Sequence, residues 1–180
     1  MKATGIVRRI DDLGRVVIPK EIRRTMRIRE GDPLEIYTEK DGEVIFKKYS
    51  PMGELSEFAA QICESLNKST GCVTVVCDRD SVIAVAGAPR RELAEKRVSP
   101  ELEQIMEARR QYRPESGAQR PPLLDGDDRH VVSVAAPILS EGDVLGCITF
   151  VSPPEAPPVG DLEYKLAQTV SCFLGRQLES

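Results

Sequence analysis

The sequence predicts an α+β protein in two parts: a small β-rich unit over residues 1–50 and a larger α+β domain over residues 56–180, joined by a linker at 51–55. The first part holds short runs of β-branched residues separated by Gly and Pro turns. The second alternates amphipathic helical stretches with apolar runs of strand length. Charge divides the chain in the same way, since residues 1–29 hold nine Lys or Arg against three acids, a net +6, whereas all 180 residues sum to −4.

The first 50 residues are expected to form four short strands and one two-turn helix. Turn residues such as Asp41-Gly42 separate the strands, which are predicted at residues 4–10, 15–18, 34–38 and 43–48. Pro19 fits the first turn of the helix at residues 20–27, with Ile22 and Met26 on its buried face. A unit this small makes a poor core by itself. We therefore expect an interleaved dimer, in which a second chain supplies the missing apolar surface.

The basic residues of this unit indicate a polyanionic partner, although a merely solvated charged surface is the alternative. Residues 30–180 sum to −10, that is −4 less +6, so a cationic unit sits on an acidic body. The aromatic residues Tyr37, Phe46 and Tyr49 follow the basic stretch, which disfavours base stacking on single strands and favours duplex DNA. The candidate DNA-binding residues are Arg8, Arg9, Arg15, Lys20, Arg23, Arg24 and Arg27. The acids among them, Asp11, Asp12 and Glu21, either orient the arginines or simply lower their repulsion.

Three segments carry a resemblance: Gly5-Ile6-Val7-Arg8, the run from Asp12 to Pro19, and Glu21-Ile22-Arg23-Arg24-Thr25. Together they resemble the swapped-hairpin DNA-binding domain of AbrB-type transition-state regulators, over about residues 1–50. The resemblance implies an interleaved dimer that contacts DNA through Arg8, Arg15, Arg23 and Arg24. Arg27 departs from the family, where a helix-ending glycine is common. With its long C-terminal domain the chain resembles regulators of endospore-forming bacteria, which implies activation or repression of sporulation genes.

Residues 56–180 are expected to alternate helices with a mostly antiparallel sheet. Helices are predicted at 54–68, 99–112 and 160–178, and strands at 72–77, 82–86, 123–124, 130–139 and 144–151. This order resembles a GAF domain, a small-molecule sensing fold, whose pocket would lie between the sheet and residues 90–130. The Asn-Lys-x-Asp signature of cyclic-nucleotide GAF domains is absent, so the ligand is unknown. His130 is expected to be a polar residue at a strand edge rather than a ligand contact.

The last predicted helix has an apolar stripe wider than a small sheet requires. Its members are Leu162, Leu166, Val170, Phe173, Leu174 and Leu178. We expect this helix and the one at 54–68 to pair with a second copy, with Leu166 and Leu174 facing outward. Two interfaces per chain would then close a homotetramer.

Metal, cofactor and catalytic chemistry are not indicated. The five cysteines form no Cys-x-x-Cys pair, and His130 is the one histidine, so a zinc site or a Cys–His nucleophile is disfavoured. Two other function classes were weighed: the antitoxin of a toxin–antitoxin pair, which would carry a short disordered tail, and a GAF-like reductase acting through cysteine. The chain has no signal-peptide stretch and no apolar run that could span a membrane, which favours a cytoplasmic protein associated with the nucleoid.

Overall fold

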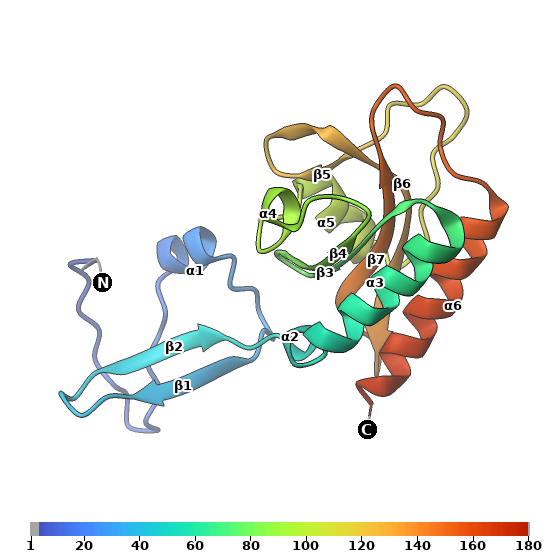
Figure 1. Ribbon diagram of the computed structural model, residues 1–180. Coiled ribbons are helices and arrows are strands. Elements are labelled where there is room, and N and C mark those ends of the chain that lie inside the picture. Colours follow the sequence, from blue (N-terminus) through green and yellow to red (C-terminus); the bar gives the residue numbers. More distant parts are fainter. Residues whose placement is uncertain (1–3, 180) are drawn as a thin grey trace. The chain divides into compact units, whose positions relative to one another are not determined.

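The computed structural model describes residues 4–179 and separates into two compact units, Met1–Tyr49 and Ser50–Ser180, called here the N-terminal and C-terminal units (Figure 1). The N-terminal unit holds helix α1 (Lys20–Met26) and an antiparallel hairpin of β1 (Leu34–Thr38) and β2 (Val44–Lys48). The hairpin register runs from Leu34 opposite Lys48 to Thr38 opposite Val44. Gly42 closes it at a φ of +82°, a left-handed conformation that glycine adopts without steric cost. The predicted helix and hairpin are therefore present.

The other two strands predicted for this unit do not form. Residues 4–10 and 15–18 flank the expected turn, in which Asp11 N–H donates to Arg15 O at 3.0 Å, but neither segment belongs to a strand. Their apolar side chains lie in solvent, with Val7 89% and Val17 69% exposed. A strand is defined by a partner ladder, and within one chain these segments have none. The β-branched residues of these segments favour the extended backbone of a strand, but no neighbouring strand is present to pair with them.

The C-terminal unit is built on a five-stranded antiparallel sheet in the order β4-β3-β7-β6-β5. Its strands are β3 (Val73–Asp78), β4 (Val82–Ala86), β5 (Pro122–Leu124), β6 (Asp127–Ser140) and β7 (Asp143–Ser152). Its helices are α2 (Pro51–Glu54), α3 (Ser56–Thr70), α4 (Arg90–Leu93), α5 (Pro100–Glu107) and α6 (Asp161–Gln177). The helix expected to reach residue 112 ends at Glu107, because Arg109 takes a left-handed φ of +55°.

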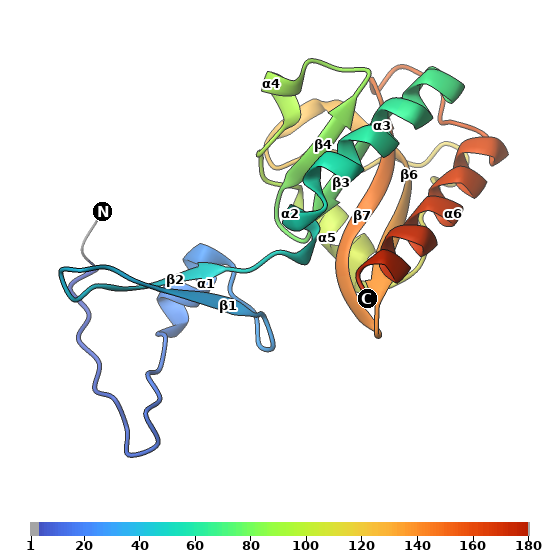
Figure 2. The same ribbon diagram turned by 60° about the horizontal axis from the view of Figure 1, so that its bottom comes forward.

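Two apolar clusters cover the two faces of this sheet. Helices α3 and α6 lie on the same face, as Figure 2 shows, and enclose a cluster that includes Ala59, Phe150 and Leu174. The Phe58 and Phe173 rings meet between these helices at a centroid distance of 5.9 Å. Helices α4 and α5 cover the other face. The space there, where a ligand pocket was expected, is filled by buried side chains such as Leu102 and Met106.

The segment expected to be a linker, 51–55, is part of the C-terminal unit. Pro51 stands at the first turn of α2, a position that suits its fixed φ. Met52 is fully buried in the cluster beneath α3 and α6. Pro51 and Gly53 are typical linker residues, but burial of the apolar Met52 side chain between them draws this segment into the core.

Arg120 holds the loop that leads into α6. Its guanidinium donates to the hydroxyls of Ser133 at 3.0 Å and Ser152 at 2.8 Å, on the neighbouring strands β6 and β7. It also donates to the backbone carbonyls of Pro154 at 2.8 Å and Ala156 at 2.6 Å. Arg120 therefore anchors residues 153–156 of this loop to β6 and β7, while the start of α6 is capped by Glu163, which accepts from the N–H of Gly160 at 3.0 Å.

Candidate nucleic-acid interface

Asp11 organises the turn that presents Arg15. Its Oδ1 accepts from the backbone N–H groups of Leu13 at 3.0 Å and Arg15 at 2.8 Å, and its Oδ2 accepts from Arg15 Nε at 2.9 Å. These bonds to Arg15, backbone first and side chain second, hold the pKa of the Asp11 carboxyl below its usual range. Of the two alternatives left open by the sequence, pairing with an arginine is the one seen for Asp11. No such bond from Asp12 is seen in the described part of the chain.

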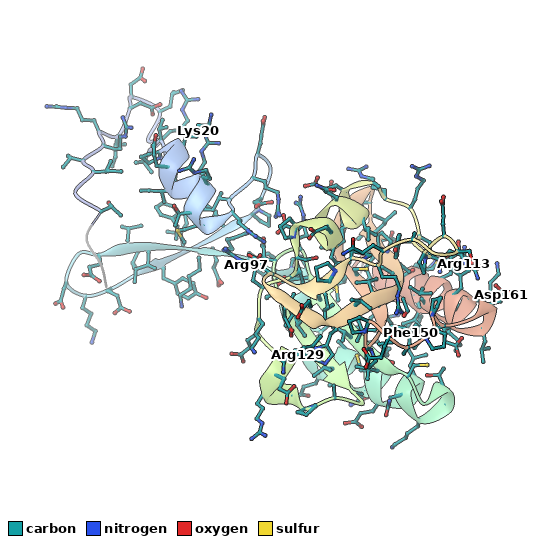
Figure 3. All side chains as sticks on the ribbon, turned by 90° about the horizontal axis from the view of Figure 1, so that it is seen from above. Lys20, Arg97, Arg113, Arg129, Phe150 and Asp161 are labelled. Atoms are coloured by element: carbon teal, nitrogen blue, oxygen red, sulfur yellow. The ribbon has the colours of Figure 1, made fainter. Side chains whose placement is uncertain are left out.

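Helix α1 carries the other cations on its outer face. Lys20, Arg23 and Arg24 are exposed, and Figure 3 labels Lys20 at the start of this helix. Arg23 Nε donates to the carbonyl of Ile18 at 3.2 Å, which draws this guanidinium back towards the segment before the helix. Arg8 and Arg9 are also exposed. Six of the seven candidate cations thus lie on the surface, with two of them oriented by a hydrogen bond.

Arg27 occupies the position where α1 ends. Its backbone is left-handed, with φ +51° and ψ +41°, and the N–H of Ile28 reaches back to Arg23 O at 2.8 Å. This is the conformation that favours glycine after a helix, which explains physically why glycine is common there in the resembling family. Lys48 Nζ from β2 donates to Arg27 O at 2.8 Å. Arg27 is half-buried and helps to end the helix as well as carrying charge.

Lys48 and Asp32 hold the end of α1 in place and were not expected from the sequence. Lys48 Nζ lies 3.6 Å from Asp32 Oδ2, and Asp32 also accepts from the N–H of Arg29 at 2.8 Å. Together they tie the end of α1 to strand β2. Lys48 and Asp32 are 16 positions apart, so no local pattern could have paired them.

The apolar surface of the N-terminal unit is largely uncovered. Val7, Ile10, Leu13 and Val17 are each at least 69% exposed, and Ile36 on β1 is 61% exposed. No residue of α1 is buried. A unit that leaves this much apolar side chain in water lacks a core of its own.

The residues of the apolar stripe predicted on α6 differ in burial, because α6 packs on the sheet with only one side. Leu174 is fully buried in the core, which corrects its expected outward position. Leu166, Val170 and Leu178 are half-buried against the same cluster. Leu162 and Phe173 are 62% and 46% exposed. The outer part of the stripe therefore consists of Leu162 and Phe173, with Leu166 and Val170 at its margin.

Three of the five cysteines are buried, as expected of small apolar core residues, whereas Cys72 is half-buried and Cys172 is exposed. All five are free thiols, and Cys63, Cys77 and Cys147 are buried. Burial raises the pKa of Cys63 to about 12, and the pKa of Cys77 is raised chiefly by its hydrogen bond with Cys147. Among residues 4–179 no group of three or more His, Cys, Asp or Glu is arranged to hold a metal ion.

Comparison with known proteins assigns the chain to a family. The family profile described as "Stage V sporulation protein T C-terminal, transcription factor" matches residues 54–179. Stage V sporulation protein T of Bacillus subtilis is 49% identical over 180 residues, covering 99% of each chain. The chain belongs to the stage V sporulation protein T family. This is a family of transcription factors rather than enzymes, which confirms the resemblance to a sporulation regulator.

The two units also match separate proteins. Residues 7–53 match the profile of the MazE bacterial antitoxin, described as antidote-toxin recognition. The B. subtilis transition state regulatory protein AbrB is 63% identical over 51 residues, which are 28% of this chain and 52% of AbrB. The GAF domain of a phosphoenolpyruvate-protein phosphotransferase from Coxiella burnetii aligns with a TM-score of 0.53 at 15% identity, covering 69% of this chain and 82% of that one. The AbrB-like and GAF-like folds are thereby confirmed. Within the described residues, none of the helices combines the length and apolar character needed to cross a bilayer.

Proposed function

We propose that the N-terminal unit binds duplex DNA through Arg8, Arg15, Arg23 and Arg24 and thereby regulates sporulation genes. Arg9, Lys20 and Arg27 add charge around them. This proposal is supported chiefly by the exposed cations of the unit, among which Arg15 is oriented by the bond from its Nε to Asp11 Oδ2. An arginine guanidinium reaches phosphate oxygens or guanine edges in two-point contacts. The protein would act in the cytoplasm, associated with the nucleoid.

Alanine substitutions at the four arginines test this role. Each is expected to weaken binding by about 1–3 kcal/mol where a base contact is lost, and to lower the salt slope by about one where only a phosphate contact is lost. Fluorescence anisotropy with promoter DNA at several salt concentrations separates the two cases. Folding should survive, because exposed charges contribute little stability. Four variants that all bind like the parent would overturn the proposal.

We further propose that two N-terminal units interleave into one DNA-binding dimer. The exposed side chains of Val7, Ile10 and Val17 would be buried by the second copy, and residues 4–10 and 15–18 would gain the strand partners that they lack. A fragment ending at Ser50 should sediment as a folded dimer. A folded monomer at micromolar concentration would exclude the interleaved arrangement.

A second interface is proposed on the outer side of α3 and α6, where Phe173 is exposed beside Phe58 and Leu162 is exposed nearer the start of α6. With the N-terminal dimer it would close a tetramer, and linked DNA-binding dimers would gain affinity for long DNA without new contacts. Phe173→Glu should convert the tetramer to a folded dimer, measured by light scattering and circular dichroism. Leu174→Glu, one position along but buried, should instead unfold the C-terminal unit. A Phe173→Glu variant that remains tetrameric would refute this interface.

The C-terminal unit is proposed to tune this activity by sensing or assembly. The alternative is an antitoxin-type autoregulator, which the MazE match over residues 7–53 favours. Limited proteolysis distinguishes them, since antitoxins of this fold usually carry a poorly ordered toxin-binding tail. A protease-resistant fragment of residues 50–180 is expected here, because its sheet is covered on both faces. Rapid loss of that fragment would favour the antitoxin.

A further inference from the structure

An open cleft of about 510 Å³ lies at the β5–β6 edge of the C-terminal unit. One side carries Lys96 and Arg97, from the segment between α4 and α5. The other side is the turn of residues 124–127, together with Arg129 on β6. A volume of this size is in the range of small-molecule sites. The cleft is distinct from the interior of the α4–α5 face, which is filled by apolar side chains.

The backbone beneath Lys96 and Arg97 is fixed on both sides. Lys96 O accepts from the N–H of Val82 at 2.9 Å, and Arg97 O accepts from the N–H of Asp125 at 3.1 Å. A β-bridge joins Arg97 to Ser81 as well. Two adjacent cations are thus presented from a segment tied to β4 and to the β5–β6 turn. Little ordering of the backbone would be needed to bind a ligand there.

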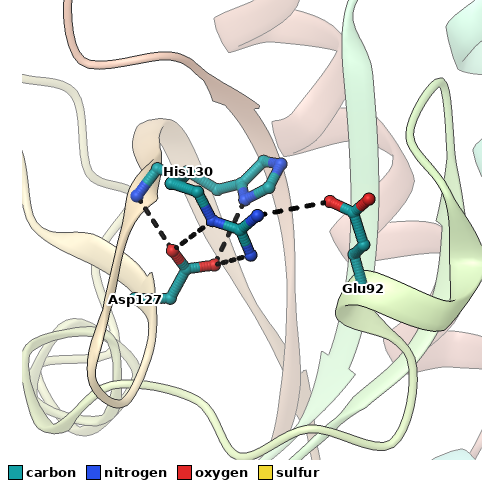
Figure 4. A network of polar contacts seen from close by, with 4 residues as sticks. Glu92, Asp127 and His130 are labelled. Carbon is teal, nitrogen blue, oxygen red and sulfur yellow. Dashed lines mark hydrogen bonds and ion pairs between the residues drawn. The ribbon is translucent and has the colours of Figure 1, made fainter.

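Arg129 is oriented by two carboxylates, Asp127 and Glu92, which are labelled in Figure 4. Its Nε lies 3.0 Å from Asp127 Oδ1, and its Nη1 lies 3.7 Å from Glu92 Oε2 on α4. Asp127 Oδ2 also lies 3.4 Å from His130 Nδ1. The side-chain bond from Arg129 is the main reason that the pKa of Asp127 is lowered to about 2. The oxygens of Asp127 are therefore ionised and already occupied by internal donors.

Lys96 and Arg97 differ from Arg129 in having no such partner. Both side chains are exposed, and within residues 4–179 neither makes an ion pair or a side-chain hydrogen bond. Two carboxylates line the cleft, Asp125 and Asp127. Asp127 is bonded to Arg129 and Asp125 also has a partner, so the donors of Lys96 and Arg97 remain for an external acceptor. An anionic oxygen group is the ligand chemistry that fits them.

We propose that this cleft binds a small anionic molecule through a phosphate or carboxylate group, with Lys96 and Arg97 as its main contacts and Arg129 as a fixed third donor. Such binding would give a ligand class to the sensing role proposed above for the C-terminal unit. Anion binding itself does not depend on that role, but its effect on regulation does. The volume of the cleft is that of a small-molecule site, whereas DNA binding is proposed for the N-terminal unit.

The test is a titration of the full chain, labelled with ¹⁵N-arginine, with inorganic phosphate and, separately, with succinate at constant ionic strength in a zwitterionic buffer. Saturable shifts of the Arg97 and Arg129 Nε–H signals are expected with one of the two anions, which also identifies the preferred group. Lys96→Gln combined with Arg97→Gln should weaken binding about tenfold or more, as expected for the loss of charge-assisted bonds. Arg90→Gln combined with Arg91→Gln, an exposed pair on α4 outside the lining, is the matched control and should change it less than about twofold.

Three results would overturn the proposal. The first is the absence of saturable shifts in the parent with either anion. The second is an equal loss of affinity in the two double variants, which would indicate general electrostatics. The third is weaker DNA binding by Lys96→Gln with Arg97→Gln, together with no small-anion binding in the parent, which would assign the cations to DNA. Since the titration contains no DNA, its failure is separate from failure of the proposed DNA-binding role.

Discussion

Asp11→Asn is expected to weaken DNA binding even though it removes a negative charge from the DNA-binding surface. Both backbone donors of the turn, Leu13 and Arg15, bond to Oδ1, which an asparagine oxygen can replace. Arg15 Nε bonds to Oδ2 at 2.9 Å, where asparagine would present an NH₂ donor. The substitution therefore keeps the turn and releases the Arg15 side chain.

The size of the effect follows from the entropy of fixing one long side chain on binding. That cost corresponds to about a two- to twelvefold change in Kd if Arg15 must be ordered by DNA instead of by Asp11. Fluorescence anisotropy with duplex DNA at a fixed, low salt concentration measures it. Because Asp11 has a lowered pKa, the carboxylate stays ionised at neutral pH, and the difference from the parent should be constant between about pH 6 and pH 8.

Asp12→Asn is the matched control for this experiment. It removes the same charge one residue away, where no bond to an arginine is seen in the described chain. Loss of an acid alone should leave DNA affinity unchanged or raise it, since it reduces repulsion from phosphates. The two variants should therefore lie on opposite sides of the parent. If both bind equally, Asp11 does not position Arg15 for DNA.

Three further outcomes are expected. Gly175→Ala should lower the urea midpoint of the C-terminal unit, because the new Cβ would lie 2.1 Å from the Leu139 carbonyl oxygen. Overpacking costs about 1–3 kcal/mol, against the ~1 kcal/mol that alanine gains over glycine in a helix. Gly53→Ala, whose Cβ would have its nearest contact at 3.9 Å, is the control and should be neutral or stabilising; equal midpoints for the two variants would contradict the close approach at Gly175. Asp127→Asn should make the stability of the C-terminal unit less dependent on acid pH. In the parent, the pKa of Asp127 is about 2, below the usual value, so the stabilisation by this carboxylate is complete above about pH 4 and is lost as pH falls through about 2. Acid titrations of parent and variant, followed by circular dichroism, compare the two. Arg27→Gly should raise the thermal midpoint of the full chain, because glycine adopts the left-handed backbone at this position without steric cost. The expected gain in the free energy of unfolding is under about 1 kcal/mol, since glycine also gives the unfolded chain more conformational freedom. A lower midpoint would refute strain at Arg27.

Local chemistry was enough to predict most elements and the character of the candidate interface. Asp41-Gly42 predicted the β1–β2 hairpin, because few other dipeptides turn a chain so tightly. Ser99-Pro100 predicted the start of α5, and Ser99 does accept from the N–H of Leu102 at 3.0 Å. The net charge of residues 1–29 predicted a cationic surface, because charged side chains remain exposed whatever the chain packs against.

Tertiary structure decided what depends on residues far apart in the chain. The apolar stripe of α6 follows from helical period alone, but Leu174 is buried and Phe173 exposed because the sheet fixes the rotation of the helix. Strand propensity at residues 4–10 could not create the partner that a strand needs. The carboxylates that orient Arg129 also lay beyond any local pattern, because Glu92 on α4 is 37 positions from Arg129 in the sequence and only the fold brings the two side chains to 3.7 Å. Propensity is a property of neighbours in sequence, whereas burial and charge pairing are settled by neighbours in space.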